Sequence, residues 1–437
     1  MRNFKALFLT ATAVFASYGT SYLISPAQPS RASLNSIPPR SICDGLKNEV
    51  YQWRGQQIRY IATGPIDAKE TVLLIHGLFV NADTWRNTLT ALGNAGYRTH
   101  ALDLLGSGYS SKPLPSSLEA KLLDGERGRF YESTDDIHCD LNRNQLLQSK
   151  SPRTNGIAKQ SSIRENVVLG TASGGRRVTK QLDLRHPLNS CYNFFTWAEQ
   201  INDFTHDVIF QGEDKWEDGS PKTTSLIANS KGCIVALQAC LDKPEYYNGV
   251  CAINPTYREL HESEMRFPRL RKPLVRRLQK FLRNNGRGLY KFVSGSRGII
   301  KKLLKEPYHN HEAIDDELLT AISEPLKLPN AAEIVFDELS YSTGPLFEQQ
   351  LQDIYDSRHT TGQKSIWVVY GKKDPWLHPR RVESLITTPF KENDEPVVDE
   401  VIAIENAGHC PHDERPEEVV PILLKFLKTC NSATFSD

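Results

Sequence analysis

The feature that most constrains this chain is a serine held between two small residues at the junction of a predicted strand and a predicted helix. Ala228 and Gly232 lie two residues before and two residues after Ser230. The apolar run 225–228 predicts the strand, and the apolar stretch 233–240 predicts the helix. A strand and a helix can approach each other across so sharp a turn only where these flanking residues are small. The pattern therefore favours a nucleophile elbow with Ser230 as the candidate nucleophile.

Short apolar runs on either side of this turn predict a mainly parallel sheet. Residues 71–75 form a continuous apolar run of the kind that is buried on both faces of a parallel sheet. A helical pattern over 84–95 and a strand over 99–102 follow with short connections, which is typical of a βαβ unit. The other predicted elements are a strand pair at 50–53 and 57–62, a helix at 196–209, strands at 250–253, 365–370 and 400–404, and a terminal helix at 417–428. The predicted fold class is α/β, with a mostly parallel sheet flanked by helices.

Two loops that follow predicted strands carry an acid and a histidine. Asp374 follows the strand 365–370, and His409 follows the strand 400–404. Because parallel sheets place their sites at the carboxyl ends of strands, we expect both side chains near Ser230. A serine hydroxyl needs a base to take its proton, and the base needs a carboxylate to fix its tautomer. The chain order of serine, acid and histidine predicts a catalytic triad.

Backbone donors for a developing oxyanion are predicted beside the serine. His76, Gly77 and Leu78 end the run 71–75 and form the loop that supplies one such donor in this arrangement. Lys231, the residue after the candidate nucleophile, supplies the other. The backbone N–H groups of Leu78 and Lys231 are therefore the candidate oxyanion hole, worth about 3 kcal/mol per donor in the transition state.

Other polar residues near strand ends are assigned structural roles. The alternative position for the acid, after the strand 250–253, holds Asn254 and no carboxylate, which favours Asp374. Asp103 is expected to order its own loop. Four further histidines show no convincing metal-ligand spacing and are interpreted as surface or lid residues: His138, His309, His311 and His412. No metal and no organic cofactor is implied.

Taken together, these motifs resemble a known family, the plant and algal α/β-hydrolases that include pheophytinase and chlorophyll dephytylase. The resemblance covers most of residues 50–430 apart from one insertion. It rests on His76-Gly77 followed by Trp85, on the loop 103–111, on Ala228-Asn229-Ser230, on 192–207, on 341–346, on 371–376 and on Gly408-His409-Cys410-Pro411.

The resemblance implies an α/β-hydrolase fold with a helical lid and hydrolysis of a carboxylic ester in a plastid. A phytyl ester of a chlorophyll-type pigment, or another lipid-like ester, is the implied substrate. Two residues depart from the family pattern: Ala228 replaces the usual glycine, and Lys231 replaces an apolar residue. The Lys231 side chain either assists anionic substrates or points to solvent.

The same fold also carries other functions, so alternatives remain. One is a non-catalytic ligand-binding protein, and another is a hydrolase of a different bond, such as a thioester or a carbon–carbon bond. Ser230 at the elbow argues against epoxide hydrolase or haloalkane dehalogenase chemistry, which places an aspartate there.

Two stretches interrupt the strand and helix pattern of the core, which is assigned to 44–254 and 361–437. Residues 114–190 are polar and hold few apolar clusters, which predicts a partly disordered insertion. Residues 255–360 read as a basic helical lid. From Arg266 to Lys305 the chain has fourteen Lys and Arg and no acidic residue.

The lid sequence is also amphipathic. One helical face is predicted to gather Leu274, Val275, Leu278, Phe281 and Leu282. A basic amphipathic helix of this kind can lie on an anionic membrane surface, whereas the alternative is a solvated basic face. The overall net charge of +1 gives no indication of nucleic-acid binding.

Residues 1–43 are interpreted as a targeting segment. Arg2 and Lys5 flank the apolar run 6–16, which is short for a membrane-spanning helix and resembles a secretory signal. Residues 25–41 are rich in Ser, Pro and Arg, and no acidic residue precedes Asp44, as in a transit peptide. The two parts resemble the import sequence of plastid proteins in algae with secondary plastids, and secretion is the alternative.

Cysteine usage favours the plastid over secretion. The eight cysteines are scattered without a CxxC pair and are interpreted as free thiols in a reducing compartment.

Overall fold

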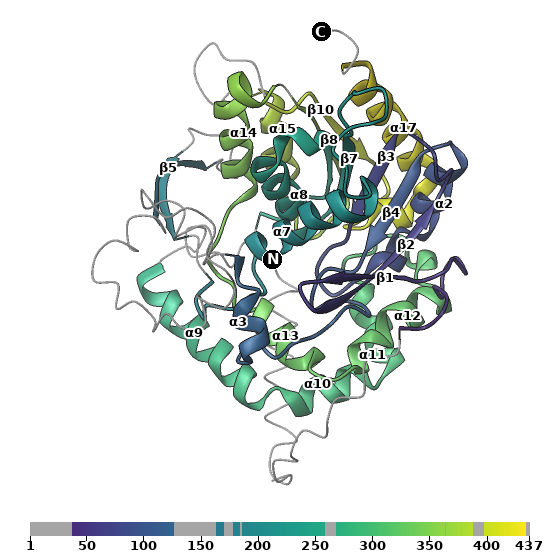
Figure 1. The fold of residues 1–437 in the computed structure, drawn as a ribbon. Helices are drawn as coiled ribbons and strands as arrows, with labels where there is room; N and C mark the ends of the chain where they lie inside the picture. The colour runs from purple at the N-terminus through teal and green to yellow at the C-terminus, as the bar shows by residue number, and fades with distance from the viewer. Residues whose placement is uncertain are drawn as a thin grey trace.

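An eight-stranded sheet forms the centre of the computed structural model (Figure 1). Its order is β1-β2-β4-β3-β7-β8-β9-β10. The strands are β1 (Glu49–Trp53), β2 (Gln56–Thr63), β3 (Thr71–Ile75), β4 (Arg98–Leu102), β7 (Thr224–Asn229), β8 (Tyr247–Ile253), β9 (Ser365–Gly371) and β10 (Glu400–Ile404). β2 pairs antiparallel with β1 and β4, and all other neighbours are parallel. The predicted α/β class with a mostly parallel sheet is confirmed.

The structure describes residues 37–125, 163–169, 178–183, 186–257, 268–362, 364–387 and 397–433. The predicted targeting segment lies mostly outside these residues. Residues 37–43 do belong to the described fold, since the Ser41 hydroxyl is buried and donates to Asp83 Oδ1 at 2.7 Å. The seven cysteines in the described ranges are all free thiols. No helix within those ranges is long and apolar enough to cross a membrane.

Helices cover both faces of the sheet because its central strands are apolar on both sides. In β3, Leu73 and Ile75 face one hydrophobic cluster, and Val72 and Leu74 face the other, as the two-residue period of a strand requires. The helices on the first side are α7 (Phe194–Phe204), α8 (Lys231–Asp242), α14 (Phe347–Thr361) and α15 (Pro379–Thr387). Those on the second side are α2 (Arg86–Asn94) and α17 (Pro416–Ala433).

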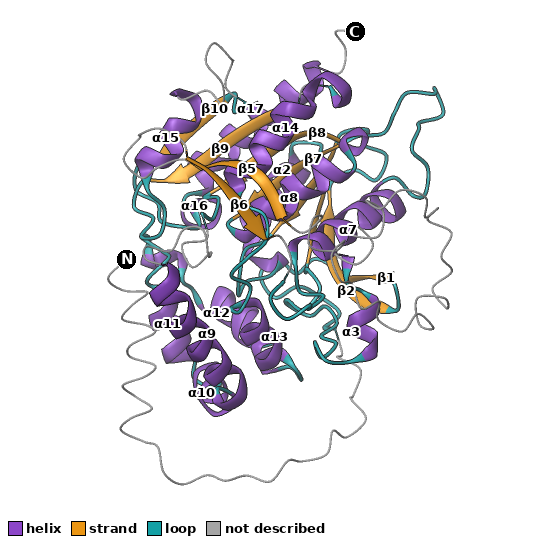
Figure 2. Cartoon of the chain, turned by 90° about the vertical axis from the view of Figure 1, so that its left-hand side faces the viewer, coloured by secondary structure: helices purple, strands orange, loops and turns teal. Residues whose placement is uncertain are grey.

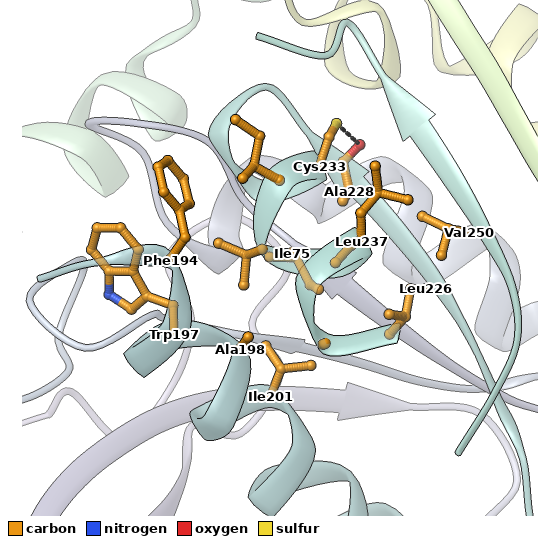
Figure 3. Close-up of a cluster of buried hydrophobic side chains, with 14 of the residues drawn as sticks. Ile75, Phe194, Trp197, Ala198, Ile201, Leu226, Ala228, Cys233, Leu237 and Val250 are labelled. Atoms are coloured by element: carbon orange, nitrogen blue, oxygen red, sulfur yellow. Dashed lines mark hydrogen bonds between the residues drawn. The ribbon is translucent and has the colours of Figure 1, made fainter. Parts of the chain in front are cut away.

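The first cluster packs directly around the helix that follows the elbow (Figure 3). Trp197 and Ile201 of α7 belong to this cluster together with Leu237 of α8, and Ile75 of β3 lies between the two helices. All four side chains are fully or almost fully buried. The start of α8 is therefore held rigidly against the sheet, which fixes the turn that precedes it.

The helices of the lid lie between β8 and β9 in the chain. They are α9 (Pro268–Asn285), α10 (Arg287–Ser294), α11 (Arg297–Leu304), α12 (Asp316–Ser323) and α13 (Ala331–Glu338). In Figures 1 and 2 they gather on one side of the sheet. The helix α14 falls within the predicted lid range but packs in the core, where Phe347, Leu351 and Ile354 are buried in the same cluster as α8. The helical lid therefore ends before α14.

The predicted insertion contains regular structure that the sequence pattern did not predict. α3 (Leu118–Leu122) opens it, and β5 (Ile163–Leu169) pairs antiparallel with β6 (Val178–Asp183) in a separate two-stranded sheet. A hairpin outside the main sheet needs no continuous apolar run, so periodicity does not reveal it. Residues 126–162, 170–177 and 184–185 of the insertion lie outside the described residues, so the predicted partial disorder stays a prediction.

Candidate active site

Ser230 sits in a strained turn between β7 and α8. Its backbone has φ 55° and ψ −118°, a conformation that non-glycine residues rarely adopt. A Cβ at Gly232 would lie 2.6 Å from the carbonyl oxygen of Ile75 and 2.7 Å from that of His76, so only glycine fits there. The small residue that the sequence pattern required is thus explained by the close approach of α8 to the end of β3.

The structure brings the predicted acid and base together. His409 Nδ1 lies 2.6 Å from Asp374 Oδ2. Because a carboxylate only accepts hydrogen bonds, Nδ1 carries the proton and Nε2 is left to accept one. The Asn229 amide donates to the His409 carbonyl oxygen at 3.1 Å, which joins the elbow to the histidine loop. Ser230 and His409 are 9% and 7% exposed, so the arrangement is largely closed to solvent.

Several donors stabilise the charged form of Asp374. Burial by itself raises the pKa of this carboxyl, but the charge and hydrogen bond of His409 lower it. Hydrogen bonds from the Asn254 amide at 2.7 Å and from the Trp376 backbone N–H at 2.8 Å act in the same direction. The net result is a pKa below the ordinary value for aspartate, so the carboxylate stays ionised beside the histidine.

Asn254 is a site residue that the sequence reasoning considered only as a missing acid. Its side chain is fully buried, and its backbone has a positive φ of 46°. Besides Asp374, it donates to the Gly408 carbonyl oxygen at 3.3 Å and accepts from the Gly371 N–H at 3.2 Å. It therefore joins the loops after β8, β9 and β10. The signal was present in the sequence, because Asn254 directly follows a buried strand.

The loop after β3 lies against the elbow. A Cβ at Gly77 would lie 3.1 Å from the Ser230 Cβ. His76 Nε2 accepts from the Leu104 N–H at 3.0 Å, so this buried imidazole is neutral with its proton on Nδ1. Burial and then the nearby charge of Lys231 lower the pKa of His76 to about 3. The loop therefore approaches the serine at Gly77 without adding a charge.

The Lys231 side chain is buried, so the interpretation that it points to solvent is wrong. The side chain is 9% exposed, and its ammonium lies 2.9 Å from Glu338 Oε2 and 4.1 Å from the centre of the Trp197 ring. Its charge is thus already neutralised by a lid residue and by the face of an aromatic ring. No sequence signal connects Lys231 with Glu338, because the two residues are 107 positions apart.

Asp103 orders its loop, as predicted. Its carboxylate accepts from the backbone N–H groups of Ala82 and Tyr109 at 2.8 and 2.7 Å and lies 3.3 Å from the Arg59 guanidinium. His412, in contrast, was assigned to the surface or the lid, and this prediction is wrong: it is buried against the core, with its ring 4.1 Å from that of Trp85. Its neutral aromatic ring fills a core position. Burial lowers the pKa of His412 to about 3.

A buried carboxylate joins the histidine loop to the lid. Glu414, in the short helix α16 (Pro411–Glu414), accepts from the backbone N–H groups of Gly408 and Cys410 at 3.0 and 3.1 Å. Its other oxygen accepts from the N–H groups of His309 and Asn310 at 2.7 and 2.8 Å. The lid segment that carries His309 and Asn310 is therefore fixed to the loop that carries His409.

A small cavity lies near the site. A cavity of about 30 Å³ lies next to the loop after β3, lined by residues such as Phe79, Ile334 and Glu338. This volume accommodates one or two water molecules and no ester of any size. The residues that the structure describes contain no group of three or more His, Cys, Asp or Glu able to hold a metal ion.

Comparisons with known proteins agree with this architecture. A family model described as "Alpha/beta hydrolase family" matches residues 72–422. The chloroplastic pheophytinase of Arabidopsis thaliana is 27% identical over 248 residues, which cover 55% of this chain and 46% of that protein. The match thus spans about half the length of that relative.

Solved structures show the same fold at low sequence identity. The epoxide hydrolase CorEH superposes with a TM-score of 0.51 at 16% identity, over 88% of this chain and 99% of that one. A mutant of an epoxide hydrolase from Solanum tuberosum gives a TM-score of 0.52 at 14% identity, over 88% and 99% of the two chains.

Proposed function

The chain belongs to the alpha/beta hydrolase family, and on this basis we propose that it is a serine hydrolase that cleaves a carboxylic ester through an acyl-enzyme. The observation that carries the proposal is the strained backbone of Ser230, joined through Asn229 to a histidine loop whose imidazole is paired with a buried carboxylate. Backbone strain at a non-glycine residue persists where function requires it, and a nucleophile elbow requires it.

In the proposed reaction, each member of this arrangement has a defined role. Ser230 Oγ attacks the ester carbonyl carbon while His409 Nε2 takes the hydroxyl proton. The imidazolium, stabilised by Asp374, then returns that proton to the departing alcohol oxygen. A water molecule, deprotonated by the same nitrogen, attacks the acyl-enzyme and releases the acid. The serine hydroxyl recovers its proton, so the cycle closes without a cofactor.

The backbone N–H groups of Leu78 and Lys231 are the proposed oxyanion donors. The close approach of Gly77 to Ser230 supports the first, and the position of Lys231 at the start of α8 supports the second. A helix start carries partial positive charge, which favours a developing oxyanion. Because Glu338 and Trp197 already engage the Lys231 ammonium, we propose that this residue contributes its backbone and not its side chain.

We propose a lipid-like ester as substrate, with the phytyl ester of a chlorophyll-type pigment as the leading candidate, in a plastid. Similarity to chloroplastic pheophytinase supports both the proposed substrate and the proposed compartment. The serine at the elbow favours this relative over the epoxide hydrolases of similar fold, whose nucleophile position holds an aspartate. Free thiols at the seven described cysteines are consistent with a reducing compartment.

Turnover of a graded substrate panel tests the proposal. The panel runs from short to long p-nitrophenyl esters and ends with pheophytin and chlorophyll, with phytol release measured directly. Ser230→Ala is expected to lower kcat by about 10⁴–10⁶-fold on every substrate that is cleaved. Ser357→Ala, a partly exposed serine of α14, is the matched control and is expected to retain full activity.

The outcomes separate the mechanism from the substrate. Phytol release that Ser230→Ala abolishes supports both. Cleavage of short esters alone keeps the mechanism and removes the pigment. Equal rates for wild type and Ser230→Ala on every substrate, together with no labelling of Ser230 by a fluorophosphonate, overturn the hydrolase and favour a ligand-binding protein.

A further inference from the structure

The helices α9, α10 and α11 form one edge of the molecule. In Figure 1 they follow one another along the lower rim, with α12 and α13 between them and the sheet. Figure 2 shows the same three helices together at one end, seen from the side. We call the solvent-facing side of these three helices the basic rim.

The basic rim carries a dense positive charge. Its exposed cations are Arg276, Arg277, Lys280, Arg287, Lys291, Arg297, Lys301, Lys302 and Lys305. Arg287 and Arg297 pair with acidic side chains from neighbouring helices. Lys291, Lys301 and Lys302 have no acidic partner among the described residues, and the chain between 266 and 305 contains no acid at all. This surface therefore matches an anionic partner.

Large apolar side chains stand among these cations. Leu274, Phe281 and Phe292 are 68%, 44% and 60% exposed. Leu274 and Phe281 are seven residues apart, so they lie two turns apart on one side of α9. Phe292 is flanked by Lys291 on α10. Exposed phenylalanines next to lysines are unfavourable in water but suit the boundary between lipid headgroups and acyl chains.

The remaining apolar residues of α9 face the protein. The sequence pattern predicted a single apolar face of five residues, but Val275, Leu278 and Leu282 are partly buried. On the same inner side, the buried Gln279 amide donates to the Leu339 carbonyl oxygen at 3.0 Å. The helix therefore has an inner side that anchors it and an outer ridge formed by Leu274 and Phe281. That division follows from the packing of α9 on α13.

We propose that the basic rim docks on the surface of an anionic lipid bilayer, with Leu274, Phe281 and Phe292 entering the headgroup region. The cations supply long-range attraction to the anionic surface. The three apolar side chains supply contact with the lipid, which a soluble polyanion does not offer. The docking itself is independent of catalysis. Its consequence, delivery of a lipid-like ester to the closed site, rests on the proposed function.

Vesicle sedimentation of the full chain tests the docking. The vesicles contain either phosphatidylcholine alone or phosphatidylcholine and phosphatidylglycerol in equal parts. Each basic side chain near an anionic surface contributes about 5-fold to partitioning. The variant Lys291→Gln/Lys301→Gln/Lys302→Gln is therefore expected to bind the anionic vesicles about 100-fold more weakly than wild type. Added salt should weaken wild-type binding in the same direction.

Two further variants complete the test. Leu274→Ser/Phe281→Ser/Phe292→Ser is expected to lose binding to the anionic vesicles, whereas Ile66→Ser, an exposed apolar side chain outside the lid, is expected to keep it. Lys47→Gln/Lys215→Gln/Lys243→Gln, a set of exposed lysines outside the lid, serves as the charge control.

Three results would overturn the proposal: equal recovery with neutral and anionic vesicles, equal loss in the charge control, or full binding by the triple-serine variant. The last result would mean that the rim attracts any polyanion, nucleic acid included. Ser230→Ala is expected to bind vesicles as wild type does. Failure of vesicle binding with turnover intact rejects docking alone, and docking without turnover rejects the hydrolase alone.

Discussion

The buried pair of Lys231 and Glu338 gives a prediction whose size follows from its surroundings. The two side chains are 9% and 7% exposed, and their charged atoms are 2.9 Å apart. Removing one partner of such a pair leaves a buried charge and costs about 3–5 kcal/mol of unfolding free energy. The Trp197 ring, 4.1 Å from the ammonium, offsets about 1–2 kcal/mol of this cost when Glu338 is the residue removed. We therefore expect Glu338→Leu to cost about 2–3 kcal/mol and Lys231→Met about 3–5 kcal/mol.

The double variant distinguishes a paired charge from two independent contacts. Lys231→Met/Glu338→Leu leaves no buried charge, so its unfolding free energy should lie within about 1–2 kcal/mol of wild type. Urea denaturation followed by circular dichroism measures all three variants. The control is the exposed pair Lys425–Glu400, for which each single change should cost less than about 1 kcal/mol. If the two single effects at Lys231 and Glu338 simply add in the double variant, the reasoning is refuted.

Four further outcomes can be checked. Asp374→Asn should lower kcat about 10⁴-fold in the ester assay, because an amide favours the wrong tautomer of the catalytic histidine. Asn254→Ala removes a hydrogen bond to the Asp374 carboxylate at 2.7 Å and should lower kcat about 10-fold or more with little change in KM. An unchanged kcat would assign Asn254 a purely structural role. Gly232→Ala should lower Tm by forcing a Cβ against backbone carbonyls 2.6 and 2.7 Å away, whereas Gly288→Ala in α10, where nothing lies within 4 Å, should raise stability by about 0.5–1 kcal/mol. His412 has a pKa of about 3 in the folded chain, below its unfolded value, so its contribution to stability is present above pH 6.5 and is lost as the pH falls. His412→Leu should therefore reduce the slope of unfolding free energy against pH by about 1.4 kcal/mol per pH unit between pH 6 and 4. An unchanged slope would contradict this.

The elements that the sequence predicted best are those whose environment is uniform along the chain. β10, a partly buried edge strand, has the predicted bounds 400–404. β3 also has its predicted bounds, 71–75, and every residue in it is buried. A strand that is buried between two layers of helices must be apolar at every position or nearly so, and the sequence records this requirement directly. Once the strands are known, the loops at their carboxyl ends are known too. Asp374 and His409 could therefore be named from the sequence, and the structure pairs them.

The features that were missed depend on contacts between distant parts of the chain. The burial of Lys231 depends on Glu338, and the inward side of α9 depends on α13. Neither relation has a periodic signature, since each is decided by how the lid packs on the core. α14 was assigned to the lid for the same reason, because its sequence does not reveal that it packs against α8 in the core.

The contacts between lid and core also decide which part of the lid can admit a substrate. The segment 306–310 is fixed to the loop that carries His409. The Pro307 carbonyl oxygen accepts from the His409 N–H at 2.7 Å, and the Glu414 carboxylate accepts from the N–H groups of His309 and Asn310. Moving this segment would pull the histidine loop away from Asp374 and break the pairing of His409 with that carboxylate. α13, in contrast, meets the site through Lys231 and Glu338 and packs on α9. On the proposed function, an opening that keeps His409 paired with Asp374 would therefore displace α13 together with α9, and α9 carries the outer ridge of Leu274 and Phe281.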